Sequence, residues 1–375
     1  MTAKKMMNIG KKARFVIFAA ILSLMSFLSY GRGIGVNAER FGGDAVAAER
    51  HAGATGIHAR AGCVIELSSR RILFEKNGEE QLPMASTTKI ATALTVLDEL
   101  TENGDESRLD ETFSVPASCC GVEGSSVYLK EGEDTTAREL LYGLMLRSGN
   151  DCAATLAVRV SGSIKKFAEK MNQTAMRAGA LHTRFKNPHG LPEKGHYTTA
   201  RDLSMITALA LENKTFAKIV NTRRYEPKNW TNKNKMLAEY DGAFGVKTGY
   251  TKQAGRCLVS AAERNGMSLI CTALNCSDTY GESKKLLDDA FAAYDLSLLQ
   301  AAESPVPLDT KAGKISAKTG KDLRYPLLSA ELPYVKKTTI AFDSPQKDGN
   351  GREIYGQLRI YLANSLLFSE NLFKL

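Results

Sequence analysis

One stretch, from Pro83 to Leu100, constrains the fold most, because it predicts a helix buried inside a protein. Its apolar residues follow the i, i+3, i+4, i+7 spacing of a helix that packs on a core, at Ile90, Ala93, Leu94 and Leu97. Other apolar residues of the run PMASTTKIATALTVLDEL widen that surface. The remainder of the chain is therefore expected to pack around this helix.

The first turn of this predicted helix carries Ser86 and Lys89, which lie three residues apart and share one face. Free backbone N–H groups and the helix dipole make the beginning of a helix electropositive, so a lysine is unfavourable there. That potential and partial burial both lower the pKa of an ammonium group. A neutral Lys89 could take the Ser86 hydroxyl proton, making Ser86 a candidate nucleophile and Lys89 its general base. A helix-capping serine and a lysine that extends to solvent are the alternative.

The pattern Ser-x-x-Lys is weak evidence alone, because it occurs at three places: Ser86/Lys89, Ser163/Lys166 and Ser344/Lys347. The second lies in the charged run SIKKFAEK, which is typical of a solvated helix face. The third follows a proline in SPQKDGNG, which is typical of a turn. Only the first precedes a buried helix, so only the first is retained as a candidate site.

The N-terminal residues 1–38 predict a signal peptide. They combine basic residues with an apolar run from Phe15 to Tyr30 and a small-x-small site at Val36-Asn37-Ala38; Ala45-Val46-Ala47 is a second cleavage candidate. The apolar run has 16 residues, fewer than the about 20 that span a membrane. We therefore favour a cleaved signal peptide over an uncleaved anchor, and expect a protein at the extracytoplasmic face of the cell envelope or secreted.

The net charge of +9 belongs mostly to this leader, because residues 1–38 hold six Lys or Arg residues and no acid. The remainder has 44 basic and 41 acidic residues, a net charge of +3, which gives no support for a nucleic-acid partner. The C-terminal run from Leu366 to Phe373 is too short and irregular to predict an amphipathic membrane helix. Peripheral membrane contact is therefore unsupported there.

The cysteines and histidines predict no metal site. The seven cysteines form no C-x-x-C pair and no zinc-type grouping with histidine, and most lie in apolar runs, as small buried residues do. The vicinal pair Cys119-Cys120 leaves a redox role open. The sequence also lacks H-E-x-x-H and G-x-S-x-G, which argues against zinc proteases and α/β-hydrolases.

The order of predicted elements indicates an antiparallel sheet assembled from both ends of a domain. A linker at 39–60 precedes a hairpin, and about 160 mostly helical residues follow before three more β-type runs. The predicted strands are 61–67, 70–76, 244–248, 256–263 and 268–275, and a helix at 281–299 closes the domain. This order predicts an α+β fold with a helical block inserted between the strands. Alternating runs at 305–375 predict a small all-β C-terminal domain.

Two further short motifs bring polar groups to turns and strand ends. Ser148-Gly149-Asn150 lies between two predicted helices, so both polar side chains could face a cleft; a plain helix cap is the alternative. Lys247-Thr248-Gly249 ends a predicted strand and offers a cation, a hydroxyl and room for a substrate backbone. A second such triplet, Lys318-Thr319-Gly320, lies in a polar run outside the first domain and is interpreted as chance.

Taken in order, the three motifs resemble the signature of penicillin-binding proteins and serine β-lactamases. Longer stretches, including LLYGLMLRSGNDCAATLA, FKNPHGLPEKGHYTTARDL and GVKTGYTKQAGRCLV, are similar to the D-alanyl-D-alanine carboxypeptidases of the low-molecular-mass class, peptidase family S11. The resemblance covers about residues 60–300. It implies a catalytic domain of the β-lactamase/DD-peptidase type at 61–300, and the tail fits that class's second domain.

The resemblance also implies a reaction. Ser86, activated by Lys89, would attack the bond between the two terminal D-alanines of a peptidoglycan stem pentapeptide and form an acyl-enzyme that water hydrolyses. Ser148 would relay a proton to the leaving amine, and Asn150 would orient the substrate amide or Lys89. β-Lactam antibiotics imitate the D-Ala-D-Ala end and should acylate Ser86. No metal or organic cofactor is required.

Substrate binding is implied for the third motif. Lys247 and Thr248 would bind the terminal carboxylate, and Gly249 would make room for the substrate. The backbone N–H groups of Ser86 and Tyr250 would hold the oxyanion. Such an enzyme would limit cross-linking during cell-wall synthesis or remodelling.

Three other functions stay open at this point. A serine β-lactamase would need a base for deacylation, which Glu169 offers superficially although a solvent-facing helix residue is the simpler interpretation. A DD-endopeptidase would use the same motifs. A non-catalytic peptidoglycan-binding protein could retain the fold, although the intact motifs argue against it. Cys152 and Cys257 replace the small apolar residues expected beside two motifs, and no catalytic role is assigned to them.

Overall fold

The computed structural model describes residues 56–101 and 104–375. The predicted signal peptide and the first part of the predicted linker lie outside these residues. The last residues of that linker belong to the folded core, since Ile57 and Ala59 are buried beneath the first sheet. Both side chains are apolar, which explains why the packed structure begins before Ala61.

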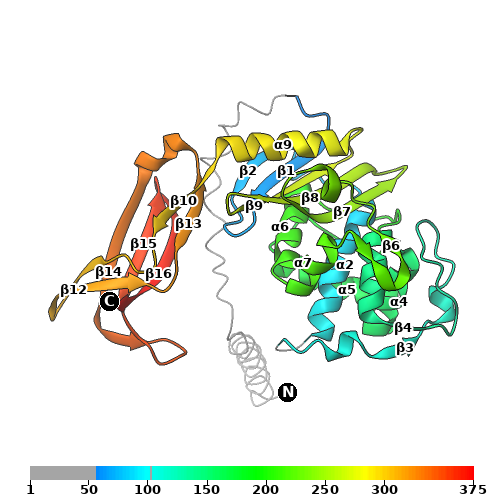
Figure 1. Ribbon diagram of the computed structural model, residues 1–375, viewed down its shortest axis with the longest axis horizontal. Coiled ribbons are helices and arrows are strands. Elements are labelled where there is room, and N and C mark those ends of the chain that lie inside the picture. The colour runs from blue at the N-terminus through cyan, green and yellow to red at the C-terminus, as the bar shows by residue number, and fades with distance from the viewer. Residues whose placement is uncertain (1–55, 102–103) are drawn as a thin grey trace, which may run out of the picture.

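A five-stranded antiparallel sheet forms the centre of the first region (Figure 1). Its strands are β1 (Ala61–Glu66), β2 (Ile72–Lys76), β7 (Ala243–Thr251), β8 (Gly255–Arg264) and β9 (Met267–Leu274), in the order β2-β1-β9-β8-β7. β1 pairs with β9, with Cys63 opposite Thr272 and Ile65 opposite Ile270. This pairing confirms the predicted sheet built from both ends of the domain.

Helices cover both faces of this sheet. They are α2 (Lys89–Leu100), α3 (Ala137–Tyr142), α4 (Asn150–Ser161), α5 (Ile164–Arg177), α6 (Ala200–Leu211), α7 (Lys214–Asn221), α8 (Met236–Glu239) and α9 (Thr279–Ala293). α6 packs on β1 and β9 from one side, and α9 packs on β8 and β9 from the other (Figure 1). The intervening segments add two small strand pairs: β3 (Thr112–Ser114) with β4 (Asp134–Thr136), and β5 (Arg224–Tyr225) with β6 (Trp230–Thr231).

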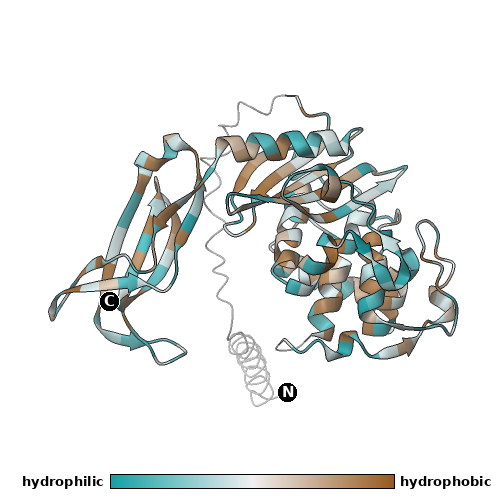
Figure 2. Ribbon diagram, viewed as in Figure 1, coloured by the Kyte–Doolittle hydropathy of each residue, from teal (hydrophilic) through white to brown (hydrophobic). Residues whose placement is uncertain are grey.

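Alternation along the strands separates two cores. Cys63 and Ile65 point to the helical block, whereas Val64 between them packs with α9. Figure 2 shows apolar residues concentrated on the sheet and on the helices against it. α2 lies inside the larger core, and among its twelve residues only Asp98 and Glu99 are exposed. A helix that is buried on nearly all sides fits the prediction made from its apolar run.

Besides the short α8 and the two small strand pairs, which were not predicted, two longer elements differ from the sequence prediction. The helix expected to reach Leu299 ends at Ala293, and β10 (Asp295–Gln300) pairs with β13 (Leu323–Leu327). These residues form a strand because they pair with β13, which lies more than twenty residues further along the chain. The spacing of apolar residues along the sequence does not reveal such a pairing. α7 was not predicted; Asn213 caps it by accepting hydrogen bonds from the amides of Thr215 and Phe216.

The second region is all β, as predicted. It contains β10, β13, β11 (Val306–Thr310), β12 (Gly313–Thr319), β14 (Val335–Lys347), β15 (Glu353–Leu362) and β16 (Ser365–Lys374). Five of them form a sheet in the order β11-β12-β16-β15-β14, over a core of its own that includes Leu299, Leu358 and Ile360. In residues 56–101 and 104–375, no helix is long and apolar enough to cross a membrane.

Arg71, beside β2, joins the two regions. Its guanidinium donates to the carbonyl of Pro326 at 2.5 Å and to Glu331 at 2.5 Å. It also lies over the rings of Tyr294 and Tyr325, 5.2 and 5.3 Å from their centroids. The side chain is only 5% exposed, so this contact is shielded from solvent.

Replacing Arg71 should weaken the attachment of the second region. Removing one partner of a buried ion pair costs about 3 kcal/mol, so we expect Arg71→Ala to lower the unfolding free energy by that amount in urea. Arg324→Ala is a matched control, because Arg324 pairs with Asp322 at a site where both side chains are nearly half exposed. Its loss should stay below about 1 kcal/mol. Equal losses in both variants would show that Arg71 has no special part in joining the regions.

Candidate active site

Ser86 lies on a tight turn that leads into α2. Residues Ala85–Thr88 form a 3-10 turn, and Ala85 has a left-handed backbone with φ 49°. The Thr88 hydroxyl donates to the Ala85 carbonyl at 2.8 Å. Gly190 lies against the same carbonyl, where an added Cβ would come within 1.9 Å of the oxygen. A left-handed alanine is unfavourable, so these contacts have to hold the turn that presents Ser86.

Lys89 is enclosed directly behind Ser86. Its Nζ lies 2.9 Å from Ser86 Oγ, 2.7 Å from Asn150 Oδ1 and 2.8 Å from the carbonyl oxygen of His189. The residue is 0% exposed. Burial, followed by the nearby positive charge of Lys247, lowers the pKa of Lys89 well below its usual value of 10.5. This shift favours the neutral amine, which has a lone pair available to Ser86.

The Ser148-Gly149-Asn150 turn forms a second wall. Ser148 is buried with a left-handed φ of 64° at the end of a π-helical turn, and Asn150 begins α4. Besides accepting from Lys89, Asn150 donates through Nδ2 to the carbonyl of Glu123 at 2.5 Å. The turn and the 123–129 loop are thus fixed together. This loop is held further by Asp151, whose carboxylate accepts from Ser126, Val127 and Leu129.

β7, an edge strand of the sheet, forms the opposite wall. Lys247 is 1% exposed, and burial, followed by the charge of Lys233, lowers its pKa to about 7. Gly249 lies against the Ser86 turn, where an added Cβ would be 3.1 Å from the backbone nitrogen of Ser86. Thr248 is partly exposed and Tyr250 is 64% exposed. The structure therefore brings the three predicted motifs together around one hydroxyl.

Lys233 is a further cation that sequence reasoning missed. Its Nζ donates to Ser125 Oγ at 3.3 Å, and its charge contributes to lowering the pKa values of Lys89 and Lys247. It lies in the polar stretch between α7 and β7, whose residues follow no periodic pattern. No local signal in the sequence distinguishes it from the other surface lysines of that stretch.

His196 supports the Ser86 turn from behind and was also missed. Its Nδ1 accepts from the amide of Lys186 at 3.0 Å, so its Nε2 carries the proton and donates to Thr88 Oγ1 at 2.9 Å. Burial lowers the pKa of His196 to about 4, which keeps the ring neutral. Because Thr88 in turn donates to Ala85, a chain of hydrogen bonds reaches the residue before Ser86.

Other residues singled out from the sequence lie elsewhere. Glu169 is exposed on α5, Ser163 caps that helix by accepting from the amide of Lys166 at 3.3 Å, and Ser344 is exposed on β14. The Lys318 triplet belongs to β12 and the start of the following turn in the second region. All seven cysteines lie in the part of the chain that the structure describes, and all are free thiols. Cys152 is buried beneath the Ser148 turn, and burial raises its pKa well above the usual value.

The arrangement has the groups that acyl transfer to a serine requires. The Ser86 hydroxyl lies next to the Lys89 amine, and the backbone nitrogen of Ser86 lies near Gly249 of the edge strand β7. Lys247 and Lys233 supply positive potential beside it, which favours a substrate with a free carboxylate.

Known proteins of one family resemble this chain. The family model described as D-alanyl-D-alanine carboxypeptidase, peptidase S11, matches residues 47–278. The chain is 31% identical over 283 residues to D-alanyl-D-alanine carboxypeptidase DacF of Bacillus subtilis, covering 73% of this chain and 71% of that relative. It is 36% identical over 239 residues to a D-alanyl-D-alanine carboxypeptidase of a Streptomyces species, covering 58% and 81% respectively.

The fold has a solved counterpart. Penicillin-binding protein 5 from Haemophilus influenzae matches with a TM-score of 0.72 at 25% identity, covering 85% of this chain and 97% of that chain. Coverage this large extends beyond the first region into the β-rich second region. The predicted fold class is confirmed by this match.

The lowered pKa of Lys247 predicts a pH-dependent stability. Its folded pKa is about 7 and its usual value is 10.5, so between these values the unfolded chain binds a proton that the folded chain does not. Unfolding free energy should therefore rise with pH across this window, by up to about 1.4 kcal/mol per pH unit. Below pH 7 both states are protonated and the contribution is flat.

The variant Lys247→Met isolates this effect. In urea unfolding at pH 6, 8 and 9.5, the stability of the native protein minus that of the variant should increase with pH. Lys252→Met serves as the control, because Lys252 is exposed on the same hairpin and should give a constant difference. A constant difference for Lys247→Met as well would contradict the buried, neutral lysine.

Proposed function

Because this chain belongs to the D-alanyl-D-alanine carboxypeptidase family, we propose that it removes the terminal D-alanine from peptidoglycan stem peptides through an acyl-enzyme on Ser86. One observation carries the proposal: the fully buried Lys89 amine lies 2.9 Å from the Ser86 hydroxyl. A buried lysine beside a serine is costly for stability and useful for proton transfer.

Acylation begins with proton transfer from Ser86 Oγ to Lys89 Nζ. The oxygen attacks the carbonyl carbon of the penultimate D-alanine, and the oxyanion is stabilised by the N–H groups of Ser86 and Tyr250. When the intermediate collapses, the C–N bond breaks and the leaving amine takes a proton from the Lys89 ammonium through the Ser148 hydroxyl. D-Alanine departs and leaves an ester on Ser86, with Lys89 neutral again.

Deacylation repeats these steps with water. A water molecule gives a proton to Lys89 and attacks the ester carbonyl, and the departing Ser86 oxygen takes that proton back. Asn150 contributes by fixing Lys89 through the 2.7 Å hydrogen bond and by offering its remaining amide capacity to the substrate. No residue outside the assembled motifs has to supply a base.

Specificity for a free chain end follows from the cations. Lys247 and Thr248 would bind the terminal carboxylate, and Gly249 leaves space for the substrate along the edge of β7. Lys233 strengthens the positive potential at this end of the cleft. A substrate whose carboxylate is blocked would lose this attraction.

The same site would also bind penicillin. A β-lactam carries a carboxylate and a strained amide and would acylate Ser86 as the peptide does. The β-lactamase alternative is not favoured, because Glu169, its candidate deacylation base, is exposed on α5. Action on peptidoglycan would require the enzyme to work at the extracytoplasmic face of the envelope, where it would limit cross-linking during wall synthesis or remodelling.

Removing the nucleophile should abolish both reactions. We expect Ser86→Ala to form no covalent adduct with penicillin by mass spectrometry and to release no D-alanine from a D-Ala-D-Ala peptide. Ser344→Ala is the matched control, since it removes the serine of another Ser-x-x-Lys pattern from an exposed strand. An adduct on Ser86→Ala, or native-level release of D-alanine, would rule out the proposed nucleophile.

The pH dependence of the reaction rate should report the loss of the proton from Lys247. Loss of the Lys247 proton near pH 7 in the free enzyme weakens carboxylate binding, so kcat/KM should fall on the alkaline side. Arginine stays protonated, so Lys247→Arg should move this alkaline limb upward even where its maximal rate is lower. Rates of penicillin acylation from pH 5 to 10 give the measurement. An alkaline limb at the same pH in both proteins would exclude Lys247 as its source.

A further inference from the structure

The peptide group between Ala85 and Ser86 faces two sides of the candidate active site. It is trans, so its C=O and its N–H point in opposite directions. The Ser86 nitrogen lies on the cleft side, near β7, where a Cβ added to Gly249 would be 3.1 Å away. The Ala85 carbonyl oxygen lies on the buried side. Whatever fixes this carbonyl therefore also fixes the N–H group that the proposed reaction uses to hold the oxyanion.

The Ala85 carbonyl is held from the buried side by two neighbours. The Thr88 hydroxyl donates to it at 2.8 Å, and Thr88 is 0% exposed. The backbone at Gly190 lies so close that an added Cβ would be 1.9 Å from the same oxygen. Solvent therefore has little room to replace the Thr88 hydroxyl as a donor.

His196 determines where the Thr88 hydroxyl points. Its Nε2 lies 2.9 Å from Thr88 Oγ1, and its Nδ1 accepts from the amide of Lys186 at 3.0 Å. The ring also packs edge-on against Phe185, with 5.9 Å between the two ring centroids. Because Nδ1 is an acceptor, Nε2 carries the proton and donates to Thr88. The single hydroxyl proton of Thr88 is then directed to the Ala85 carbonyl.

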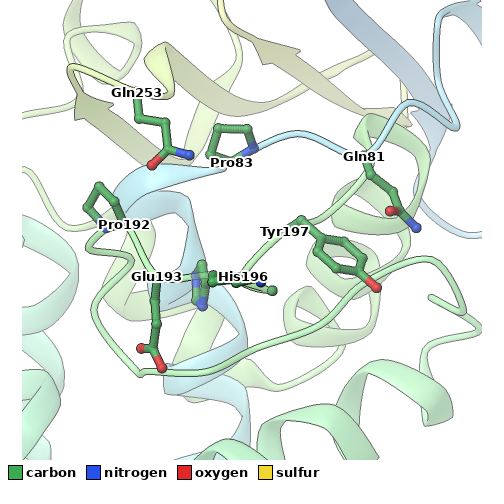
Figure 3. A pocket seen from close by; sticks show the side chains of 9 residues that line it. Gln81, Pro83, Pro192, Glu193, His196, Tyr197 and Gln253 are labelled. Carbon is green, nitrogen blue, oxygen red and sulfur yellow. The ribbon is translucent and has the colours of Figure 1, made fainter.

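The 185–196 loop brings His196 to this position. Figure 3, which views the pocket that His196 helps to line, shows its ring beside the segment that leads from Pro83 into α2. The same loop reaches the catalytic centre, since Lys89 Nζ lies 2.8 Å from the carbonyl oxygen of His189. His196 is only 7% exposed. The ring is therefore a packed part of the support beneath the Ser86 turn.

The turn needs this support because Ala85 has a left-handed backbone, with φ 49°, which a residue with a Cβ avoids. Loss of the Thr88 hydrogen bond would leave a buried carbonyl unpaired and remove a contact that opposes relaxation of the turn. Donation from His196 also polarises the Thr88 hydroxyl and strengthens its bond to the carbonyl. His196 can thus act on the Ser86 N–H group from behind, without touching the substrate.

We propose that His196 is a positioning residue for the oxyanion hole: through Thr88 and the Ala85 carbonyl, it sets the direction of the Ser86 N–H group. The inference rests on the proposed function, because only acyl transfer at Ser86 makes use of that N–H group. The oxyanion forms only in the transition state, so loss of His196 slows acylation and leaves the initial binding of the ligand unchanged.

Two amide variants separate the two ring nitrogens. His196→Gln places an N–H donor near the position of Nε2 and keeps the bond to Thr88. His196→Asn places an acceptor near Nδ1, which keeps the bond to the Lys186 amide and loses the donor to Thr88. We expect His196→Asn to lower the limiting rate of penicillin acylation about ten- to hundredfold, less than the loss of a whole oxyanion donor, and His196→Gln to stay within about threefold of the native rate.

A second pair of variants tests the middle of the chain of hydrogen bonds. Thr88→Val removes the hydroxyl and should slow acylation as much as His196→Asn, whereas Thr88→Ser keeps it and should react at nearly the native rate. Combining Thr88→Val with His196→Asn should add little, because both break one chain. Rapid-quench mass spectrometry over a range of penicillin concentrations gives the limiting rate and the half-saturating concentration. The latter reports whether the cleft is intact and should stay within about twofold in every variant.

The outcomes separate this inference from the proposed function. Equal limiting rates for His196→Gln and His196→Asn would overturn the role of His196, and so would a change confined to the half-saturating concentration. Native-rate acylation of Thr88→Val would overturn the whole chain. In each of these cases the native protein is still acylated on Ser86, so the proposed function stands. A native protein that penicillin does not acylate would remove the proposed function and the inference together.

Discussion

The enclosure of the Lys89 amine is the interaction on which the site depends. A charged lysine in a fully buried position would be very costly, so the protein holds this residue in its neutral form. Three oxygen atoms surround Nζ: the Ser86 hydroxyl, an amide oxygen and a backbone carbonyl. The neutral amine donates to the amide oxygen and the carbonyl, and its lone pair accepts from the hydroxyl. The three oxygen atoms come from the Ser86 turn, the start of α4 and the 189–190 loop. A shift of any one of these segments would therefore move or expose the Lys89 amine, which accepts the proton of Ser86.

The fold brings these segments together by closing a sheet with both ends of one domain. β1 and β9 are about two hundred residues apart in sequence and pair at the centre of the sheet. The chain between them forms the helical block, which contributes Ser86 and Asn150, and β7 contributes Lys247 from the edge. Gly249 lets that edge approach the Ser86 turn. The architecture thus determines the geometry of the site more than any single loop does.

The sequence predicted the parts that depend on local pattern and missed those that depend on distant partners. The helix after Ser86 and the strands flanking the block follow clear apolar periodicities, and the three motifs were found by type and spacing. The residues of β10 were predicted as the end of the helix at 281–299, because the strand with which β10 pairs is distant in sequence and is visible only in the fold. Lys233 and His196 act through tertiary contacts that leave no local signal.

The central claim is that Lys89 is neutral where an ordinary lysine is charged. Nuclear magnetic resonance of the lysine side chains, with the Lys89 signal assigned by its loss in Lys89→Met, measures this protonation state directly. The account predicts that, among the lysine signals that titrate well below pH 10.5, one is lost in the Lys89→Met variant while that of Lys247 remains. A Lys89 signal that titrates near 10.5, together with the exposed lysines, would contradict it.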